Sequence, residues 1–404
     1  MVSAVSVPKN QQDSRYSNKI NHLKLISILK LMLFATPVMA QKKSGFTFQW
    51  EIATEVPADS GQSVSLGIAG PVTGVYNHLF FVAGGANFPG AMPWDGGAKK
   101  YHAAGYIYCK DHRKLKVRSA GFTLPQPIAY AASCSTPEGI IYAGGENETG
   151  FSDKVWLIQS DQNGEVRFKP LPSLPVPVSN ASATFVDGIV YLAGGENNTQ
   201  TLTQLLALDL ANISDGWKKL ADIPKPVSHC VMTAAGSSSG SKIYISGGRK
   251  KNSNGISTIY PSLFVYDISA NQWQEKAPLP YALCAGTGIL QDRHILLFGG
   301  DKGIVFNKAE TLIAAINTTS DPVKKQEMIL DKNKLQSSHP GFSREIIAYD
   351  IDQDTWLVAG QLPYETPVTT TAVKWGNGIL IPSGEIRAGV RTPKILKLKI
   401  RLKQ

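Results

Sequence analysis

Charged residues gather in one short, glycine-punctuated stretch, Pro382–Arg391. It reads Pro-Ser-Gly-Glu-Ile-Arg-Ala-Gly-Val-Arg, follows an apolar segment, and carries Glu385, Arg387 and Arg391. A nearby guanidinium keeps a carboxylate ionised, and a free arginine can hold a substrate carboxylate through two hydrogen bonds. The stretch therefore predicts acid–base chemistry on an anionic substrate. The alternative is a structural ion pair at the end of a strand.

An apolar strand that ends in two glycines recurs along the chain and places this stretch in a repeat. The five regular copies end at Gly85, Gly145, Gly195, Gly248 and Gly300. Their second glycines are 60, 50, 53 and 52 residues apart, and a sixth, degenerate copy ends in Ser-Gly at Gly384, 84 residues after the fifth. A period near 50 with this pattern is typical of a β-propeller with one blade per repeat.

The second half of each repeat has its own pattern, an apolar strand often ending in Tyr-Asp, then an aromatic residue and a proline seven positions later. The aromatic and proline pairs are Phe168 and Pro175, Trp217 and Pro224, Trp273 and Pro280, and Trp356 and Pro363. Each repeat therefore holds about four short strands, as a propeller blade does. Gly-Gly, Tyr-Asp and Trp at these separations resemble the kelch repeat.

The two ends of the chain are expected to share one blade. After Gly384 only one more strand follows, Pro393–Ile400, whereas Phe46–Trp50 is followed at the same offset of seven by Pro57. We therefore predict that the N-terminal strand is the outermost strand of the C-terminal blade, which removes an exposed sheet edge at the seam. The expected fold is all-β, a six-bladed kelch-type β-propeller formed by residues 41–404 and closed by this pairing.

The first forty residues differ in kind from the repeats. Lys19, Lys24 and Lys30 flank an apolar run over residues 25–34, and a small-residue site ends at Ala40. This pattern predicts a secretory signal peptide over residues 1–40, and hence a periplasmic or secreted protein without stable membrane insertion. The alternative is an uncleaved anchor, although the run is interrupted by Lys30 and is shorter than the ~20 residues that span a bilayer.

A second departure from the repeat is an insertion over residues 301–344 in blade five. It is unusually long for a loop between blade strands, and we expect it to be partly helical around residues 309–316. Long loops inside a compact fold are often lids or binding elements.

The composition of the chain limits the classes of partner that it is expected to bind. Residues 1–40 hold five cations and one anion, so their removal lowers the formal net charge from +10 to +6. No basic run is interleaved with aromatic residues, which argues against nucleic acid as a partner, while a modest positive field suits an anionic small molecule. The histidines lack metal-ligand spacing and no phosphate-binding or dinucleotide-binding motif is present, so neither a metal nor a cofactor is expected. The four scattered cysteines are interpreted as buried apolar side chains, with one disulfide as the alternative.

The residues after each glycine pair are expected to form a ring on one face of the propeller, around the central channel. They are Ala86, Glu146, Glu196, Arg249, Asp301 and Glu385. We count Glu146, Glu196 and Arg249 as candidate substrate-binding residues. For the two glutamates the alternative is a structural role, in which each holds its tight polar loop through backbone hydrogen bonds or a neighbouring cation.

The pattern Gly384-Glu385-x-x-x-Gly389-x-Arg391 resembles the loop of the bacterial sialic acid mutarotases, also called N-acetylneuraminate epimerases, which are secreted six-bladed kelch propellers. Further resemblance lies in the Gly67–Gly70 segment leading to Ala83–Gly90, and in Phe306-Asn307 of the insertion. The shifted blade order resembles a cyclically permuted branch of that family. The blade-four loop Pro226–Cys230 departs from it, because it lacks an arginine that the family tends to carry there.

The resemblance implies an isomerase that needs no cofactor and acts on N-acetylneuraminate. Glu385 and Arg391 match the family's active pair: Glu385 would remove the anomeric hydroxyl proton, Arg391 would hold the substrate carboxylate, and a second donor or water would protonate the ring oxygen. Arg387 and Asn307 are added as candidate substrate contacts. The alternatives are a secreted kelch module that binds a glycan or protein without turnover, and a mutarotase for another sugar acid.

Overall fold

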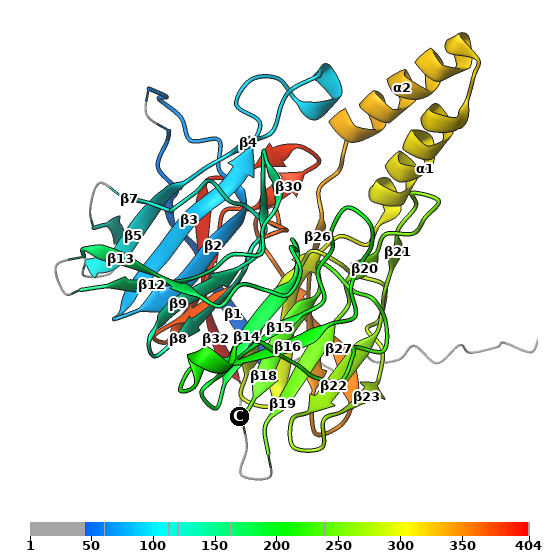
Figure 1. The fold of residues 1–404 in the computed structure, drawn as a ribbon. Helices are drawn as coiled ribbons and strands as arrows, with labels where there is room; N and C mark the ends of the chain where they lie inside the picture. Colours follow the sequence, from blue (N-terminus) through cyan, green and yellow to red (C-terminus); the bar gives the residue numbers. More distant parts are fainter. Residues whose placement is uncertain are drawn as a thin grey trace, which may run out of the picture. The chain divides into compact units, whose positions relative to one another are not determined.

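Six four-stranded antiparallel blades form the body of the protein in the computed structural model, which describes residues 45–59, 61–111, 114–118, 121–161, 164–236 and 240–402 (Figure 1). These described residues form one compact unit. The predicted cleavage after Ala40 lies outside the described residues. The expected six-bladed, all-β propeller is confirmed.

In blades one to five the main strands follow one another in the chain from the central channel outward, whereas the outermost strand of blade six is β1 from the start of the chain. Blades one to three contain β2 (Ala69–Tyr76), β3 (Leu79–Asn87), β5 (Ala104–Asp111) and β6 (Lys114–Val117); β8 (Ala132–Thr136), β9 (Gly139–Ala143), β12 (Val155–Ser160) and β13 (Val166–Leu171); and β14 (Ser182–Val186), β15 (Ile189–Ala193), β16 (Leu205–Asp209) and β17 (Lys218–Lys219). Blades four to six contain β18 (Val231–Ala235), β19 (Lys242–Ser246), β22 (Leu263–Asp267) and β23 (Gln272–Lys276); β24 (Thr287–Gln291), β25 (His294–Gly300), β26 (Ser343–Asp350) and β27 (Thr355–Gln361); and β28 (Val373–Trp375), β29 (Gly378–Pro382), β32 (Lys394–Leu402) and β1 (Phe46–Glu55). The second strand of a blade packs between two neighbouring blades, so it is apolar on both faces, as the fully buried β9 illustrates.

Shorter elements lie in the loops between the main strands. They are β4 (Lys100–Tyr101) and β7 (Phe122–Thr123) in blade one, the hairpins β10 (Glu146–Asn147) with β11 (Gly150–Phe151), β20 (Arg249–Lys250) with β21 (Thr258–Ile259), and β30 (Glu385–Arg387) with β31 (Val390–Arg391), and the 3-10 turns η1 (Pro93–Asp95) and η2 (Ile213–Asp215). All three hairpins begin at the residue after the Gly-Gly or Ser-Gly pair of their blade, the ring position predicted to face the channel mouth.

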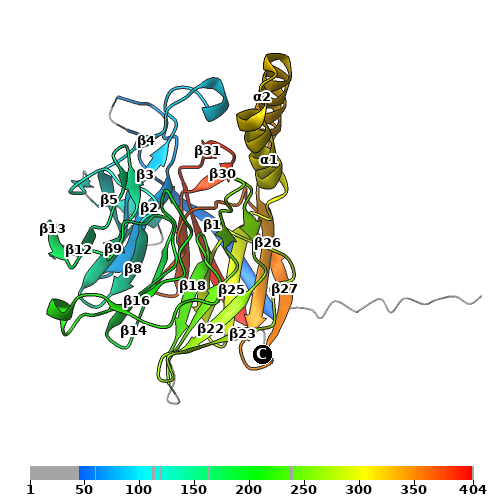
Figure 2. The same cartoon turned by 45° about the vertical axis from the view of Figure 1, so that its right-hand side comes forward.

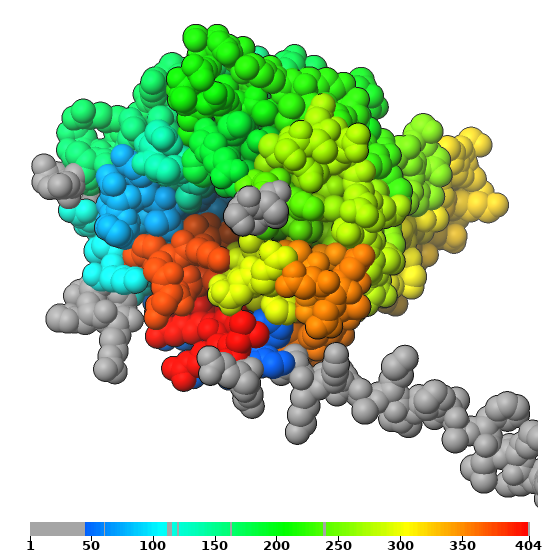
Figure 3. Space-filling model, turned by 90° about the horizontal axis from the view of Figure 1, so that it is seen from below, coloured from blue at the N-terminus to red at the C-terminus, as the bar shows by residue number. Residues whose placement is uncertain are grey.

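The seam of the propeller is the pairing of β1 with β32. These strands run antiparallel from Phe46 opposite Leu402 to Glu55 opposite Lys394, with one irregularity between Ile52 and Thr54. Seen from below, the sequence colours run around the ring until the red C-terminal strand meets the blue N-terminal one (Figure 3). The predicted closure is therefore confirmed, and β32 is an interior strand of its sheet instead of an exposed edge.

The glycine pairs are required by contact between adjacent blades. In blades one to four, a Cβ on the first glycine of the pair would lie 2.0 to 2.5 Å from a carbonyl oxygen of the next blade, closer than atoms can approach. Four second glycines of these pairs, such as Gly145, donate their N–H to that same carbonyl at 2.8 to 2.9 Å. In blade six Ser383 takes the first position, and its hydroxyl accepts the Ile68 N–H of blade one at 2.8 Å.

A pair of glycine substitutions in blade three tests this account. Gly194 and Gly188 both have positive φ, but a Cβ on Gly194 would lie 2.0 Å from the Val227 oxygen, whereas Gly188 has nothing within 4 Å. We expect Gly194→Ala to cost about 3 kcal/mol or more, from backbone strain plus overpacking, and Gly188→Ala about 1 kcal/mol, from strain alone. Urea unfolding of the two variants measures the difference. Equal losses would contradict the close-contact explanation.

The repeated tryptophans join the blades at their outer strands. Trp217, Trp273 and Trp356 each donate the indole N–H to a backbone oxygen of the preceding blade, at 2.8 to 2.9 Å. Trp50 of the seam strand packs edge-on against Phe298, but its indole N–H has no acceptor in the described part of the chain. At the offset read from the sequence, the tryptophans of blades three to five therefore form an inter-blade hydrogen bond, which Phe168 of blade two cannot form and Trp50 of blade six does not form within the described residues.

A closed ring of backbone hydrogen bonds surrounds the channel. One residue from each blade, just before or at the start of the inner strand, donates its N–H to the same position of the preceding blade and accepts from the next, at 2.7 to 3.0 Å. The six residues are Gly70, Tyr130, Asn180, His229, Ala285 and Thr369. All have φ between 52° and 65°, although five are not glycine. The left-handed conformation costs about 1–3 kcal/mol at such residues, so the ring bonds must hold them in it.

The blade-five insertion forms a helical hairpin that stands off the propeller, with α1 (Ile304–Thr318) and α2 (Pro322–Ser337) side by side (Figures 1 and 2). Asp321 is the N-cap residue of α2, and its side chain accepts the N–H groups of Val323 and Lys324. The expected helix around residues 309–316 is present, but helical structure extends much further than predicted. Within the described residues, neither this pair nor any other helix is long and apolar enough to span a bilayer.

Candidate functional site

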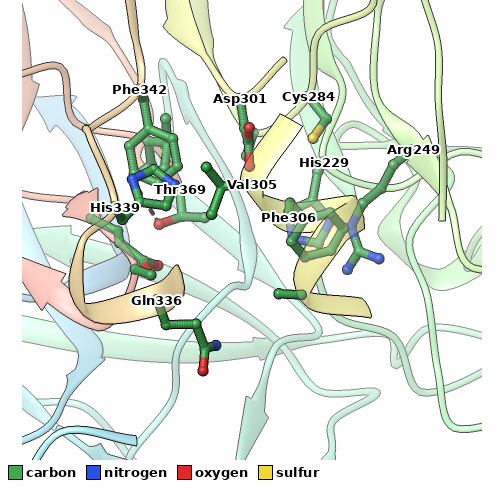
Figure 4. Close-up of a pocket in the computed structure, with 15 residues that line it drawn as sticks. His229, Arg249, Cys284, Asp301, Val305, Phe306, Gln336, His339, Phe342 and Thr369 are labelled. Carbon is green, nitrogen blue, oxygen red and sulfur yellow. Dashed lines mark hydrogen bonds between the residues drawn. The ribbon is translucent and has the colours of Figure 1, made fainter. Parts of the chain in front are cut away.

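A pocket of about 190 Å³ opens where the blade-five insertion meets the loops of blades four, five and six. Three members of the backbone ring, His229, Ala285 and Thr369, line it. Other lining residues come from the positions after the glycine pairs, from α1, and from the end of α2 and the loop behind it: Arg249, Asp301, Glu385, Val305, Phe306, Ala309, Gln336, His339 and Phe342. Figure 4 shows Arg249, Phe306 and His229 on one side, His339, Phe342 and Thr369 on the other, and Asp301 between them.

Glu385 is the predicted catalytic residue, and it lies on the pocket wall. Its carboxylate accepts the Gly389 N–H at 2.8 Å and lies 3.8 Å from the Arg391 guanidinium, and its backbone bridges to Val368. The hairpin β30–β31 creates this arrangement, because it pairs Glu385 directly with Arg391. The side chain is 20% exposed, so it is both held in place and open to a ligand.

Arg391 lies behind Glu385 and is absent from the pocket lining. Its side chain is 4% exposed, and its guanidinium stacks on the Phe88 ring with 4.6 Å between the guanidinium carbon and the ring centre. Within the described residues, Nε and Nη1 have no hydrogen-bond acceptor. An arginine in this position helps to orient the Glu385 carboxylate through their ion pair.

Arg249 is the predicted substrate contact that does reach the pocket. It donates to Glu196 at 2.8 Å and to Ser257 at 3.1 Å, and its guanidinium lies over the Phe306 ring of α1. Glu196 also accepts from Ser228 at 3.0 Å. Glu196 therefore anchors Arg249 from outside the pocket, as in the structural alternative considered for it.

The remaining predicted contacts lie away from the pocket lining. Glu146 accepts from Tyr101 at 2.8 Å and pairs with Lys99 at 3.2 Å, which holds the blade-one loop on blade two. Asn307 is in α1, where its side-chain oxygen is buried and has no donor in the described part of the chain. Arg387 is about half exposed and lies 3.6 Å from Glu365. Their substrate roles stay predictions.

Two polar groups of the pocket were not on the list of predicted site residues. Asp301 holds the ring position of blade five, and burial raises the pKa of its carboxyl, although the Gly303 N–H and the Arg249 guanidinium oppose the shift. His339 follows α2, and its Nδ1 accepts the Gly341 N–H at 3.0 Å, so the neutral ring carries its proton on Nε2. Asp301 could have been found from its place after Gly300, whereas His339 carries no sequence signal.

The two histidines that line the pocket are held in the neutral form. Burial lowers the pKa of His339, with Glu385 acting in the opposite direction and Arg387 in the same direction. Burial and the Arg249 charge place the pKa of His229 well below its usual range. No cluster of three or more potential metal ligands occurs among the residues that the structure describes, and all four cysteines are free thiols.

The insertion lines the pocket and is hydrogen-bonded to loops of blades one and four. Asn333 of α2 donates to the Trp94 backbone oxygen in the blade-one loop at 3.0 Å. Glu310 of α1 accepts the Ser257 N–H at 2.7 Å and its hydroxyl at 2.9 Å. Phe306 and Phe342 line the pocket together with several polar groups, which is the usual make-up of a small-molecule site.

The fold and this site define a six-bladed propeller whose pocket, beside the central channel, contains acidic and basic groups. Comparison with known sequences identifies the family to which the chain belongs. The model of the family described as "NANM: N-acetylneuraminate epimerase" matches residues 171–404, more than half of the chain. The chain therefore belongs to the N-acetylneuraminate epimerase family.

Individual relatives are distant. N-acetylneuraminate epimerases of Brucella melitensis and Haemophilus influenzae are 28% and 26% identical over 57% and 55% of this chain. A kelch domain-containing protein of Vibrio cholerae is 26% identical over 56% of it. The matches cover only 59%, 57% and 63% of those relatives' own lengths. The solved structure titled "Structure of YjhT" superposes with a TM-score of 0.59 over 87% of this chain and 100% of that one, at 14% identity, which shows the shared fold.

Proposed function

We propose that this protein is a sialic acid mutarotase that interconverts the α and β anomers of N-acetylneuraminate by opening and closing the sugar ring. The observation that carries the proposal is Glu385, whose carboxylate lies on the pocket wall, held by the Gly389 N–H and backed by Arg391. A carboxylate placed in this way can take the anomeric hydroxyl proton and return it.

The pocket suggests separate roles for the two arginines. Arg391 is buried behind Glu385, so we assign it to positioning the base. Arg249 lines the pocket and is the better placed of the two to contact the substrate carboxylate. The net positive charge of the chain favours an anionic sugar in general. No cofactor is needed, because ring opening requires only proton transfer.

We also propose that the protein works in the periplasm or outside the cell, on the basis of the Lys-flanked apolar run before Ala40. The permuted blade order remains a hypothesis that rests on the same resemblance.

The proposal is tested by adding purified protein to N-acetylneuraminate freshly released by a sialidase and following the α anomer by proton NMR. We expect its decay to be faster than in buffer, in proportion to protein concentration. Binding without acceleration would favour the non-catalytic kelch module, and acceleration with a different sugar acid alone would reassign the substrate.

A further inference from the structure

Two carboxyl groups occupy equivalent positions in adjacent blades and line the same pocket. Asp301 and Glu385 each follow the glycine position of their blade, and each bridges by backbone hydrogen bonds to the start of its own inner strand, at Cys284 and Val368. We propose that Asp301 is the second proton-transfer group of the site, the one that serves the ring oxygen while Glu385 serves the anomeric hydroxyl. This inference rests on the proposed function and supplies its missing partner.

The surroundings of the two carboxyl groups differ in the way that an acid and a base require. Glu385 has a guanidinium 3.8 Å away and a backbone donor. Asp301 accepts only the Gly303 N–H, at 2.7 Å on Oδ1, and no cationic atom of the described residues lies within 4 Å of its carboxyl. Its Oδ2 has no hydrogen-bond partner among those residues, and Figure 4 shows the carboxyl directed into the pocket. Two carboxyl groups that face one pocket from different surroundings can take different roles in acid–base chemistry.

The charged groups around Asp301 support the assignment. The Arg249 charge is bound to Glu196 at 2.8 Å, and Glu310 of α1 is occupied by Ser257. Burial therefore dominates and raises the pKa of the Asp301 carboxyl. The neighbouring Cys284 thiol also has a raised pKa and stays neutral.

The other titratable side chains of the pocket are weaker candidates. His229 and His339 have lowered pKa values, so both are neutral near pH 7. The N–H of a neutral imidazole is a far weaker acid than a carboxylic acid. His339 can still donate a hydrogen bond from Nε2, but it is a poor source of a proton for the leaving ring oxygen.

These two carboxyl groups account for every proton that is transferred in the reaction. In opening, the anomeric O–H gives its proton to the Glu385 carboxylate, the bond between the anomeric carbon and the ring oxygen breaks, and that oxygen takes the proton of the Asp301 carboxylic acid. After rotation about the bond beside the keto carbon, the hydroxyl that was the ring oxygen attacks the other face of that carbon and returns its proton to Asp301. Glu385 returns its proton to the new anomeric oxygen, so both groups finish as they began.

The test uses Asp301→Asn in the full-length protein, because an asparagine oxygen can still accept the Gly303 N–H and hold the turn. The anomer interconversion rate is measured against N-acetylneuraminate concentration from pH 3 to 9, a range that begins below the ordinary carboxyl pKa and so includes the raised pKa of Asp301. We expect kcat to fall about 10²-fold with little change in KM. The decline of wild-type activity as the pH rises through the Asp301 pKa should be absent from the variant. Asp301→Glu should recover part of kcat.

The matched control is Asp215→Asn, which removes an exposed carboxylate paired with Lys218 in blade three, and neither residue lines the pocket. It should behave as wild type, and thermal unfolding should show both asparagine variants folded. Wild-type kcat and pH profile in Asp301→Asn would overturn the assignment while leaving the mutarotase function intact. A lower kcat with the wild-type pH profile would also overturn it, since a structural role would produce that result. An inactive wild-type protein would overturn both proposals.

Discussion

Replacing Glu385 by glutamine is expected to lower kcat for anomer interconversion by about 10² to 10⁴-fold, the usual contribution of a positioned general base. The amide can still accept the Gly389 N–H that the carboxylate accepts at 2.8 Å, so the hairpin β30–β31 should keep its shape. What the variant loses is the ability to take a proton. Initial rates by proton NMR on freshly released N-acetylneuraminate measure the effect.

The control for this variant is Glu275→Gln on the outer strand of blade four. Glu275 is 59% exposed and lies 3.6 Å from Lys225 in an ion pair outside the pocket. Its loss should leave the rate unchanged, because an exposed pair contributes little to stability. If Glu385→Gln kept the wild-type rate, the central assignment of the site would be wrong.

Removing the seam strand should have the largest effect on stability. A chain that begins after Pro57 lacks β1, so the packing of Phe46, Trp50 and Val56 is lost and β32 becomes an exposed edge. Loss of a single large buried side chain costs about 2–5 kcal/mol, whereas a whole domain is stable by only about 5–15 kcal/mol. We expect this chain to be largely unfolded or aggregated, and inactive, by circular dichroism, size exclusion and the NMR assay.

The control truncation removes only residues 1–40, the predicted signal peptide. It should leave a folded, active protein, because every strand of the propeller remains. A folded and fully active chain lacking β1 would show that blade six closes without the N-terminal strand, contrary to the pairing of β1 with β32.

The blade count and the closure were determined by the sequence alone. The spacing of Gly-Gly and of the tryptophans is local in the chain. The glycine pairs of blades one to four contact the next blade and the tryptophans of blades three to five bond to the preceding one, so the repeat in the chain is also the repeat in space. Glu385 and Arg391 are close for an equally local reason, because the two residues face each other in one short hairpin. Short-range patterns of this kind can be predicted from the sequence, because they depend on residues that are close together in the chain.

Tertiary structure alone decided which ring residues reach the pocket and what forms its floor. Glu146 and Glu196 have the same place in the repeat as Asp301, yet both form ion pairs with cations of other blades. Of these three acidic residues, only Asp301 lines the pocket. Nothing in the types of Tyr130 or Ala285 predicts a left-handed backbone. Their conformation is imposed by hydrogen bonds that exist only once six blades have closed, and such long-range terms leave no local trace in the sequence.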